Sequence, residues 1–455
     1  MQCGFYETEI TPPLGTMIPG YFTKRVNQGV KQKLYAKAAV LENEGKTVAV
    51  LVVDAVTVQE EMPAFVRKRV HEKTGIAEDA ILITATHSHT GIPTQRDKGV
   101  YKNIQILDNE PELNPELDGK TIDQTLLLAA DAVVMAYQRL EEVNISFGIG
   151  EAKNLSYVRQ YYLEDGTVRT NPGYCKEQVV KSYSEPDPAL PVLFFTNKEG
   201  KPVGSMASFA LHHDTVSGFE VSSDYSGVVS KKLKQKYGND FVSIFFSGFC
   251  GNINHLDYVG EKQGKPFKKT TREIGEALTE EMLKTIEKAI PVLQNSLQVK
   301  METVKIKKRE LPEGFVESVK ELVKNPPPKT APMTIADPYS DRMKYAASGA
   351  LISYYDENKK TEFDIPVQVI KIGDCLIYAL VGEVFSQFAD KIRAKSPTEK
   401  NMMVEFANHT DHPYIPIKEM FLPFVYESSY FRARLEPDAG DKMVNKALEI
   451  AQEIY

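Results

Sequence analysis

Residues 80–91 have the sequence Ala-Ile-Leu-Ile-Thr-Ala-Thr-His-Ser-His-Thr-Gly, which is the clearest indication of the fold class. Its first part is short, continuous and apolar, which is typical of a strand buried on both faces of its sheet. Such strands belong to proteins in which helices cover the sheet. In open α/β sheets the functional sites lie beyond the carboxyl ends of the strands. The polar residues that follow Ala85 therefore mark a candidate site.

The rest of the chain also predicts alternating helices and strands. The apolar runs 36–41 and 47–56 flank a Glu-Asn-Glu-Gly-Lys turn and predict a hairpin. We expect helices at about residues 59–74, 122–140, 225–237, 270–290, 342–355 and 384–395 and at the C-terminus, and strands at 191–196, 203–211, 241–246, 297–306, 363–372, 375–381 and 402–407. This order indicates a mixed α/β or α+β sandwich, with mixed sheets flanked by helices.

One proline-rich segment interrupts this pattern at residues 324–333, which contain Asn-Pro-Pro-Pro-Lys. Consecutive prolines exclude both a helix and a central strand, so we expect a surface connection. Candidate polar clusters lie on both sides of it. We therefore predict a single composite catalytic domain over residues 1–455 rather than separate domains.

Composition and charge exclude several classes of protein. The 455 residues carry 55 basic and 62 acidic side chains, a net charge of −7, which lacks the basic excess expected of a nucleic-acid-binding protein. No apolar run approaches the roughly 20 residues that span a bilayer, so we expect no integral membrane insertion. A small-molecule substrate is the partner we expect, and the oligomeric state stays open.

The N-terminus and the cysteines suggest a location. The first residues lack the basic and apolar regions of a secretory signal. Cys3, Cys175, Cys250 and Cys375 are scattered, and none forms a Cys-x-x-Cys pair. This usage fits a reducing compartment and excludes a thiolate zinc site. We therefore expect a cytoplasmic protein.

The histidines carry the most specific signal. His71 stands alone on a predicted helix, whereas seven of the eight histidines form four clusters: His87 with His89, His212 with His213, His255, and His409 with His412. Residues i and i+2 of an extended chain project to the same side, so both imidazoles of the first pair can face one cavity. Such a pair either binds metal or forms hydrogen bonds in a cleft.

A metal site of this kind also needs a carboxylate. Imidazole nitrogens with a carboxylate oxygen form the ligand set of a catalytic zinc that keeps an open position for water. Glu383 follows an apolar strand and a glycine, where it can serve as that ligand. It can equally belong to the first turn of a helix over 384–395, where the helix dipole favours an acidic side chain.

Several motifs, taken together, resemble one family. They are T-H-S-H-T-G at 86–91, F-A-L-H at 209–212, S-S-D-Y-S-G at 222–227, G-F-C-G-N-I-N at 248–254 and V-G-E at 381–383. With these motifs the chain resembles the neutral/alkaline, non-lysosomal ceramidases, in order from about residue 4 to residue 430. The resemblance implies a ceramidase-like catalytic domain and a zinc-dependent hydrolase.

The resemblance also implies roles for single residues. It implies one zinc per chain, held by His87, His212, Glu383 and Tyr414. Tyr426, twelve residues after Tyr414 as in the family, is then expected to stabilise the oxyanion.

An arginine of the family does similar work, and Arg159 is the match, with Arg169 as the alternative. Either arginine can instead be an ordinary surface residue.

The implied mechanism is the attack of zinc-bound hydroxide on the scissile carbonyl. His89 lies too close to His87 in sequence to be a good second ligand, so we expect it to act as the base or acid. Gly20, in a Pro-Gly-Tyr similar to the family's, and three histidines are the expected substrate-binding residues: His213, His255 and His412. These histidines either bind substrate or line a polar cleft.

Two departures from the family pattern shape the expected substrate. The ceramidases carry a serine, often assigned as nucleophile, where this chain has Asn254. Asn254 is then either a hydrogen-bond donor to substrate or, with Asn252, a residue that holds a turn. The sequence also ends at Tyr455, without the C-terminal immunoglobulin-like domain of the ceramidases. We therefore expect an amidase that cleaves a C–N bond of a soluble N-acyl compound.

Two other functions remain open at this point. The first is a zinc hydrolase of the same fold that acts on an ester or lactone. The second is a non-catalytic protein that binds a polar ligand.

Overall fold

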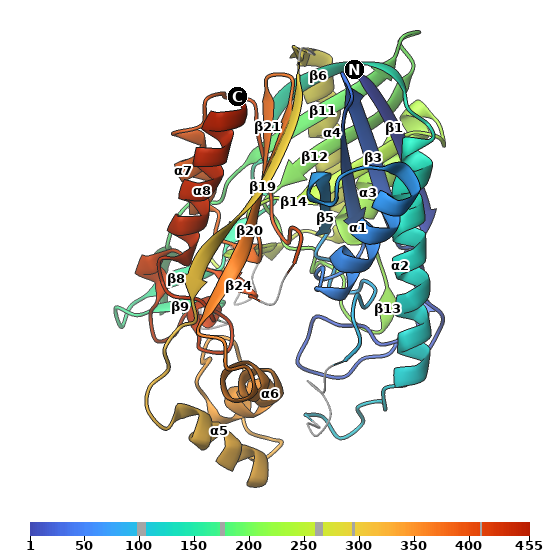
Figure 1. Cartoon of the computed structure of the whole chain (residues 1–455). Coiled ribbons are helices and arrows are strands. Elements are labelled where there is room, and N and C mark those ends of the chain that lie inside the picture. Colours follow the sequence, from blue (N-terminus) through green and yellow to red (C-terminus); the bar gives the residue numbers. More distant parts are fainter. Residues whose placement is uncertain (98–105, 173–177, 260–266, 294–295, 410–411) are drawn as a thin grey trace.

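Strands buried on both faces form the two inner layers of a four-layer structure, and helices form the two outer layers (Figure 1). The structure is a computed structural model, and it describes the whole chain except residues 98–105, 173–177, 260–266, 294–295 and 410–411. Cys175 lies outside the described residues. The mixed sheets with flanking helices confirm the expected fold class.

The larger sheet has nine strands in the part of the chain described. Their spatial order is β14 (Val242–Ser247), β12 (Pro202–Phe209), β11 (Ala189–Asn197), β6 (Glu141–Glu151), β1 (Gln2–Glu9), β3 (Tyr35–Asn43), β4 (Lys46–Val53) and β5 (Ile81–Ala85), with β18 (Ile290–Pro291) paired to β6. The pairs β4–β5 and β12–β14 are parallel, and the other pairs are antiparallel. Both parallel pairs direct their carboxyl ends to the same edge, where the motifs lie.

Four helices cover the outer face of this sheet. They are α1 (Glu61–Thr74) and α2 (Pro115–Tyr137) over β3, β4 and β5, and α3 (Asp224–Tyr237) and α4 (Thr271–Lys288) over β11, β12 and β14. Alternate residues of each strand divide between the two faces. In β4, for example, Leu51 packs under the helices, whereas Val50 and Val52 face the second sheet.

The second sheet has four strands, in the order β19 (Leu297–Lys307), β20 (Glu362–Ile372), β21 (Cys375–Ala379) and β23 (Asn401–Val404). Its inner face, with Ile370 and Ile377, shares one apolar core with the larger sheet. Helices α7 (Gln387–Arg393) and α8 (Ala439–Ile454) cover its outer face. The segment between β19 and β20 carries α5 (Phe315–Lys324) and α6 (Asp341–Ile352), with one π turn (Ser353–Glu357), at the end of the molecule opposite the two termini (Figure 1).

Short ladders connect the loops at the site edge. They are β13 (Glu220–Val221) with β2 (Gly29–Val30), β15 (Ile253–Asn254) with β7 (Tyr157–Val158), β22 (Glu383–Val384) with β24 (Tyr414–Ile415), β16 (Leu256–Asp257) with β17 (Phe267–Lys268), and β8 (Gln160–Leu163) between β10 (Val179–Ser182) and β9 (Val168–Thr170). Single 3-10 turns occur at Glu78–Ala80, Lys418–Met420 and Tyr426–Ser428.

Most elements expected from the sequence are present. The hairpin β3–β4 turns through Glu44 and Gly45, both with positive φ (51° and 79°), as a two-residue hairpin loop requires. The expected helix over 384–395 begins only at Gln387, and Glu383 lies in β22 rather than in a helical turn. Among the described residues, no helix is long and apolar enough to cross a membrane.

The shared core between the sheets predicts a stability difference between two isoleucines. Ile370 in β20 is fully buried between the sheets, whereas Ile149 in β6 is 50% exposed. We expect Ile370→Ala to lower the free energy of unfolding by about 2–5 kcal/mol, because it removes buried methyl groups and leaves a cavity. Ile149→Ala is the matched control and should change it little. Urea unfolding measures both, and equal effects would contradict a core shared by the two sheets.

Candidate metal centre

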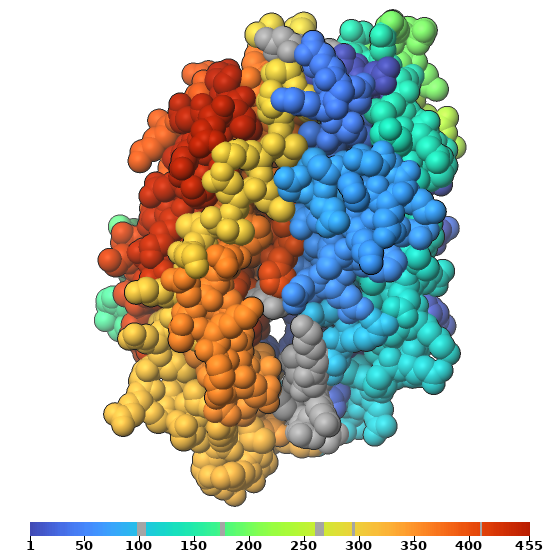
Figure 2. Space-filling view, viewed as in Figure 1, coloured from blue at the N-terminus to red at the C-terminus, as the bar shows by residue number. Residues whose placement is uncertain are grey.

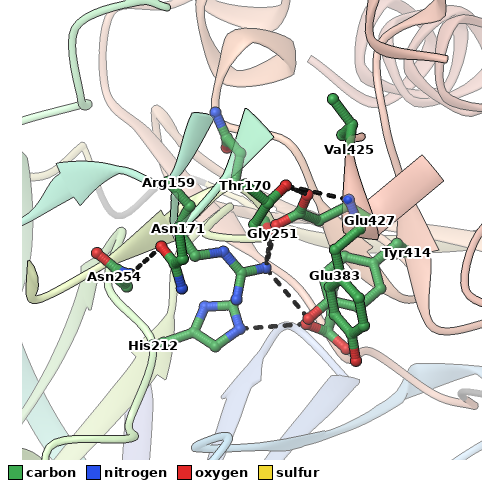
Figure 3. Close-up of polar contacts among 12 residues, drawn as sticks. Arg159, Thr170, Asn171, His212, Gly251, Asn254, Glu383, Tyr414, Val425 and Glu427 are labelled. Atoms are coloured by element: carbon green, nitrogen blue, oxygen red, sulfur yellow. Dashed lines mark hydrogen bonds and ion pairs between the residues drawn. The ribbon is translucent and has the colours of Figure 1, made fainter. Parts of the chain in front are cut away.

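Three histidines and one carboxylate converge at the edge where the parallel strands end. The nearest ring nitrogens of His87, His89 and His212 all lie within 4.8 Å of one another. Glu383 Oε2 lies 3.2 Å from His212 Nε2 and 3.7 Å from His87 Nε2 (the first contact is drawn in Figure 3). Side chains from three separate parts of the sequence thus surround one point.

His87 is held in a single orientation. It follows β5 with φ of 68°, a left-handed conformation that is uncommon for histidine and costs roughly 1–3 kcal/mol. Its Nδ1 donates to the carbonyl oxygen of Val56 at 2.7 Å, and its ring stacks on Phe406 with centroids 4.1 Å apart. The Nδ1 hydrogen bond leaves the lone pair of Nε2 facing the cluster, as metal binding requires.

His212 is oriented by a buried thiol. Phe209 and Ser247 are paired at the ends of the parallel strands β12 and β14. The third residue after each strand end is His212 and Cys250, respectively. Cys250 donates its S–H to Glu405 Oε1 at 2.8 Å, so its sulfur accepts from His212 Nδ1 at 3.4 Å. This chain of contacts also leaves Nε2 of His212 facing the cluster.

Glu383 and Tyr414 are brought together by a ladder of two residues. In the parallel pair β22–β24, Glu383 is directly opposite Tyr414, and its N–H donates to the Pro413 carbonyl at 2.5 Å. The two ligands that the family resemblance implies from this half of the chain are therefore neighbours, although 31 positions separate them in the sequence.

The atoms of the cluster fit a metal ion. His212 Nε2 and Glu383 Oε2 are buried and have no hydrogen-bond partner, although buried polar atoms are rarely left unpaired. Burial holds the pKa values of His87 and His212 well below the ordinary value, so both rings are neutral, which is the form that binds metal. Neutral imidazoles with one carboxylate are typical ligands of a divalent metal such as zinc.

His89 lies beside the cluster, and the arrangement allows two roles. Its Nε2 is 3.2 Å from His87 Nε2, close enough for a ligand or for an acid or base next to the metal. Gly20 makes room for it, because a Cβ at this position, where φ is 110°, would lie 3.0 Å from His89 Nδ1. Arg25 holds the backbone of His89 by donating to its carbonyl at 2.6 Å.

The expected oxyanion-stabilising residues differ in their surroundings. Tyr426 lines the cavity beside the cluster, and burial raises its pKa to about 12, so the phenol keeps its proton as a donor. Arg159 is buried beside Tyr414 (Figure 3), where it pairs with Glu427 at 2.8 Å and donates to Tyr414 Oη at 3.2 Å. Arg169 pairs with Asp165 at 3.3 Å. Neither arginine lines the cavity, and Arg159 is the one that contacts Tyr414.

Like Arg159 and His212, four further expected site residues do not line the cavity. Asn254 donates to Asn171 Oδ1 at 2.9 Å (Figure 3) and accepts from the Leu256 N–H, which are contacts of a loop-holding residue. His213 stacks on Tyr225, with centroids 3.9 Å apart, and burial lowers its pKa to about 3.

His412 and His255 are also largely enclosed. Burial lowers the pKa of His412 to about 3, and its Nδ1 lies 3.3 Å from the Tyr354 hydroxyl. Burial also lowers the pKa of His255. Among the expected substrate-binding residues, only Gly20 lines the cavity.

The cavity next to the cluster has a volume of about 290 Å³. His87, His89 and Glu383 form its floor, and its walls come from residues 17–22, residues 92–97, helix α6 and residues 413–434. Figure 2 shows a hollow in the surface between the orange segment that contains α6 and the blue N-terminal segments. No sequence pattern points to two wall residues, Phe22 and Arg432, because each is a single side chain in a loop without a motif.

Comparison with known proteins identifies the family. The profile described as "Neutral/alkaline non-lysosomal ceramidase, N-terminal" matches residues 2–269, more than half of the chain. The chain belongs to this ceramidase family. The search of curated proteins found no match.

Solved ceramidase structures share the fold over the whole chain. A crystal structure of the neutral ceramidase from Pseudomonas aeruginosa has a TM-score of 0.72 and 18% identity, and the match covers 100% of this chain and 75% of that one. A ceramidase complexed with C2 has a TM-score of 0.71 and 18% identity with the same coverage. The ceramidase family and fold imply an amide hydrolase, and the histidine group is one that could hold a metal ion.

The contact between Cys250 and His212 predicts an effect on metal affinity. Cys250→Ala removes the group that fixes His212 Nδ1, and loss of such a supporting contact typically costs about 10- to 100-fold in metal affinity. Cys250→Ser should keep most of the affinity, since a hydroxyl can make both contacts. Competition with a chromophoric chelator measures the dissociation constant. Cys375→Ala, at a buried thiol 1% exposed in β21, is the control, and an unchanged affinity in Cys250→Ala would contradict the assignment.

Proposed function

We propose that this ceramidase-family protein is a zinc-dependent amidase that cleaves the C–N bond of a small, soluble N-acyl compound. The observation that carries the proposal is the convergence of three histidines and Glu383, with unpaired Nε2 of His212 and Oε2 of Glu383, next to a cavity whose floor is formed by His87, His89 and Glu383. The hydrolase fold and the family support amide chemistry.

The residues divide into metal ligands and groups that act on the substrate. His87, His212, Glu383 and Tyr414 would hold the zinc, which when bound makes water nucleophilic near neutral pH and polarises a carbonyl. His89 would accept the proton of the attacking water at Nε2 and pass it to the leaving nitrogen.

A second side chain would act on the carbonyl oxygen. Tyr426 would donate its O–H to this oxygen as negative charge develops, a contribution of roughly 3–4 kcal/mol for one well-placed donor. Arg159 would then act through Tyr414 rather than on the substrate, because its guanidinium is held by Glu427 and Tyr414.

The size of the cavity supports a small substrate. A volume of about 290 Å³ lies at the lower end of the range for small-molecule sites, so it can enclose an amide with a short acyl group but not two long chains. Asn254 supplies no nucleophile and lies away from the cavity wall. Direct attack by water on the amide therefore fits this chain better than a covalent acyl-enzyme at residue 254.

Metal content and turnover of single variants test the ligand assignment. Elemental analysis should give about one zinc per chain, and the His87→Ala/His212→Ala double variant and Glu383→Ala should lose it. His89→Ala should keep the metal and lose turnover by about 100-fold or more, because a positioned acid–base group contributes that much. His71→Ala, on the exposed side of α1, is the control. Normal turnover in His89→Ala would remove its acid–base role, and a metal-free protein under zinc-replete conditions would overturn the mechanism.

The type of bond is tested with matched substrates. An amide and an ester with the same acyl group should both fit the cavity, and we expect the amide to have the higher kcat/KM relative to its uncatalysed hydrolysis. A preference for the ester, after the same correction, would favour an esterase. Tight binding without any turnover would favour the non-catalytic alternative.

A further inference from the structure

The cavity wall contains an arginine that the mechanism does not use. Arg432 lines the cavity, together with Arg434 two positions later. The guanidinium carbon of Arg432 lies 4.7 Å from the ring centre of Phe22 and 5.0 Å from that of Tyr426. The rings of Phe22 and Tyr426 thus hold the guanidinium of Arg432 in place. Tyr426 is also the residue expected to contact the carbonyl oxygen.

No carboxylate of the described residues lies within 4.0 Å of this guanidinium, and its Nε is buried without a hydrogen-bond partner. Two nearby arginines are different. Arg159 pairs with Glu427 at 2.8 Å, and Arg96 at the cavity rim pairs with Asp123 at 2.5 Å. Placing a charge in a partly desolvated wall is unfavourable unless a counter-charge joins it. Tyr426 and, at longer range, the Glu383 carboxylate already stabilise the guanidinium, and a ligand can supply the direct counter-charge.

The neighbours of Arg432 indicate where an anionic group would sit. Tyr426, which carries the guanidinium on its face, has its ring centre 5.9 Å from that of Tyr414, the ladder partner of Glu383. The guanidinium of Arg432 therefore lies close to the cluster, with the Tyr426 ring between it and Tyr414. On another wall, helix α6 contributes three small apolar side chains: Ala346, Ala347 and Ala350. The cavity thus combines a cationic point close to the reacting centre with an apolar surface.

We propose that the substrate is an anionic amide, with a carboxylate near the scissile bond that pairs with Arg432 and a short acyl group that packs on α6. An N-acyl amino acid has this chemistry. The planar guanidinium matches a carboxylate with two parallel hydrogen bonds, which a neutral amide cannot reproduce. This inference rests on the proposed function for the identity of the reacting bond, but the anion contact itself does not depend on turnover.

A binding experiment tests the contact on the full chain. N-butyrylglycine and its neutral analogue N-butyrylglycinamide are titrated into the protein by calorimetry, as purified and again after chelation, so that binding of the carboxylate to metal is excluded. We expect the acid to bind at least tenfold more tightly than the amide in both states, and Arg432→Ala to weaken the acid by about 10- to 100-fold while leaving the amide unchanged. Arg432→Lys should recover part of the loss.

The controls separate the contact from a folding defect. Arg169→Ala removes an arginine that also stacks on an aromatic ring, Phe424 at 4.3 Å, but lies outside the cavity, and it should bind both compounds like the wild type. Circular dichroism checks that each variant is folded. If Arg432→Ala does not fold, Arg432→Lys and the comparison of acid with amide in the wild type still decide the question.

Other outcomes distinguish this inference from the proposed function. Equal binding of the acid and the neutral amide to the wild type would overturn the anion contact, even if amides are hydrolysed. A similar loss of kcat for both compounds in Arg432→Ala, without a change in their relative affinity, would make Arg432 an oxyanion donor and would also overturn it. Selective binding of the acid without hydrolysis of any amide would sustain the anion contact and reject the amidase.

Discussion

The buried carboxyl group of Glu405 joins the chain segments on which the site depends. Its Oε2 accepts from the backbone N–H groups of Val384 at 2.7 Å and Cys250 at 3.1 Å, and its Oε1 accepts from the Cys250 thiol. Its own carbonyl accepts from the hydroxyl of Thr84, in β5, at 2.7 Å. One residue therefore connects the loop after β14, the start of β22 and the strand that leads to His87. A side chain without two acceptor oxygens could not hold all of them.

These contacts matter because the candidate metal ligands come from both sheets. His87 and His212 follow strands of the larger sheet, whereas Glu383 follows β21 of the smaller one. The packing of the two sheets therefore sets the distances between these side chains. A change in the apolar core between the sheets would alter those distances. Gly251 shows how close this approach is, because a Cβ at that position would lie 2.3 Å from the Glu383 carbonyl oxygen.

The sequence predicts the part of the site that local patterns encode. A buried strand followed by His-x-His locates His87 and His89, and the order of motifs locates His212, Glu383 and the family, because each signal lies within a few residues. Whether Glu383 begins a helix or lies in a strand could not be decided locally, since β22 exists only through its pairing with β24, about 30 residues away.

Long-range contacts explain the other differences. The sequence favours Arg159 but leaves Arg169 open, and the contacts of Arg159 with Glu427 and Tyr414 separate the two. The strand β6 has alternating apolar residues and could have been found, but its glycines and asparagine weaken the signal. No local sequence pattern identifies Arg432, because only the folded chain places its side chain in the wall of the cavity.

The insertion between β19 and β20 has a consequence for how such proteins diverge. Its helix α6 forms one wall of the cavity, whereas the metal donors lie on segments that the insertion does not include. Because it enters and leaves the sheet at the adjacent ends of two paired antiparallel strands, its length and sequence can change without altering the pairing that carries the reactive groups. Changes in this segment would therefore reshape one wall of the cavity and leave the histidines and Glu383 in place.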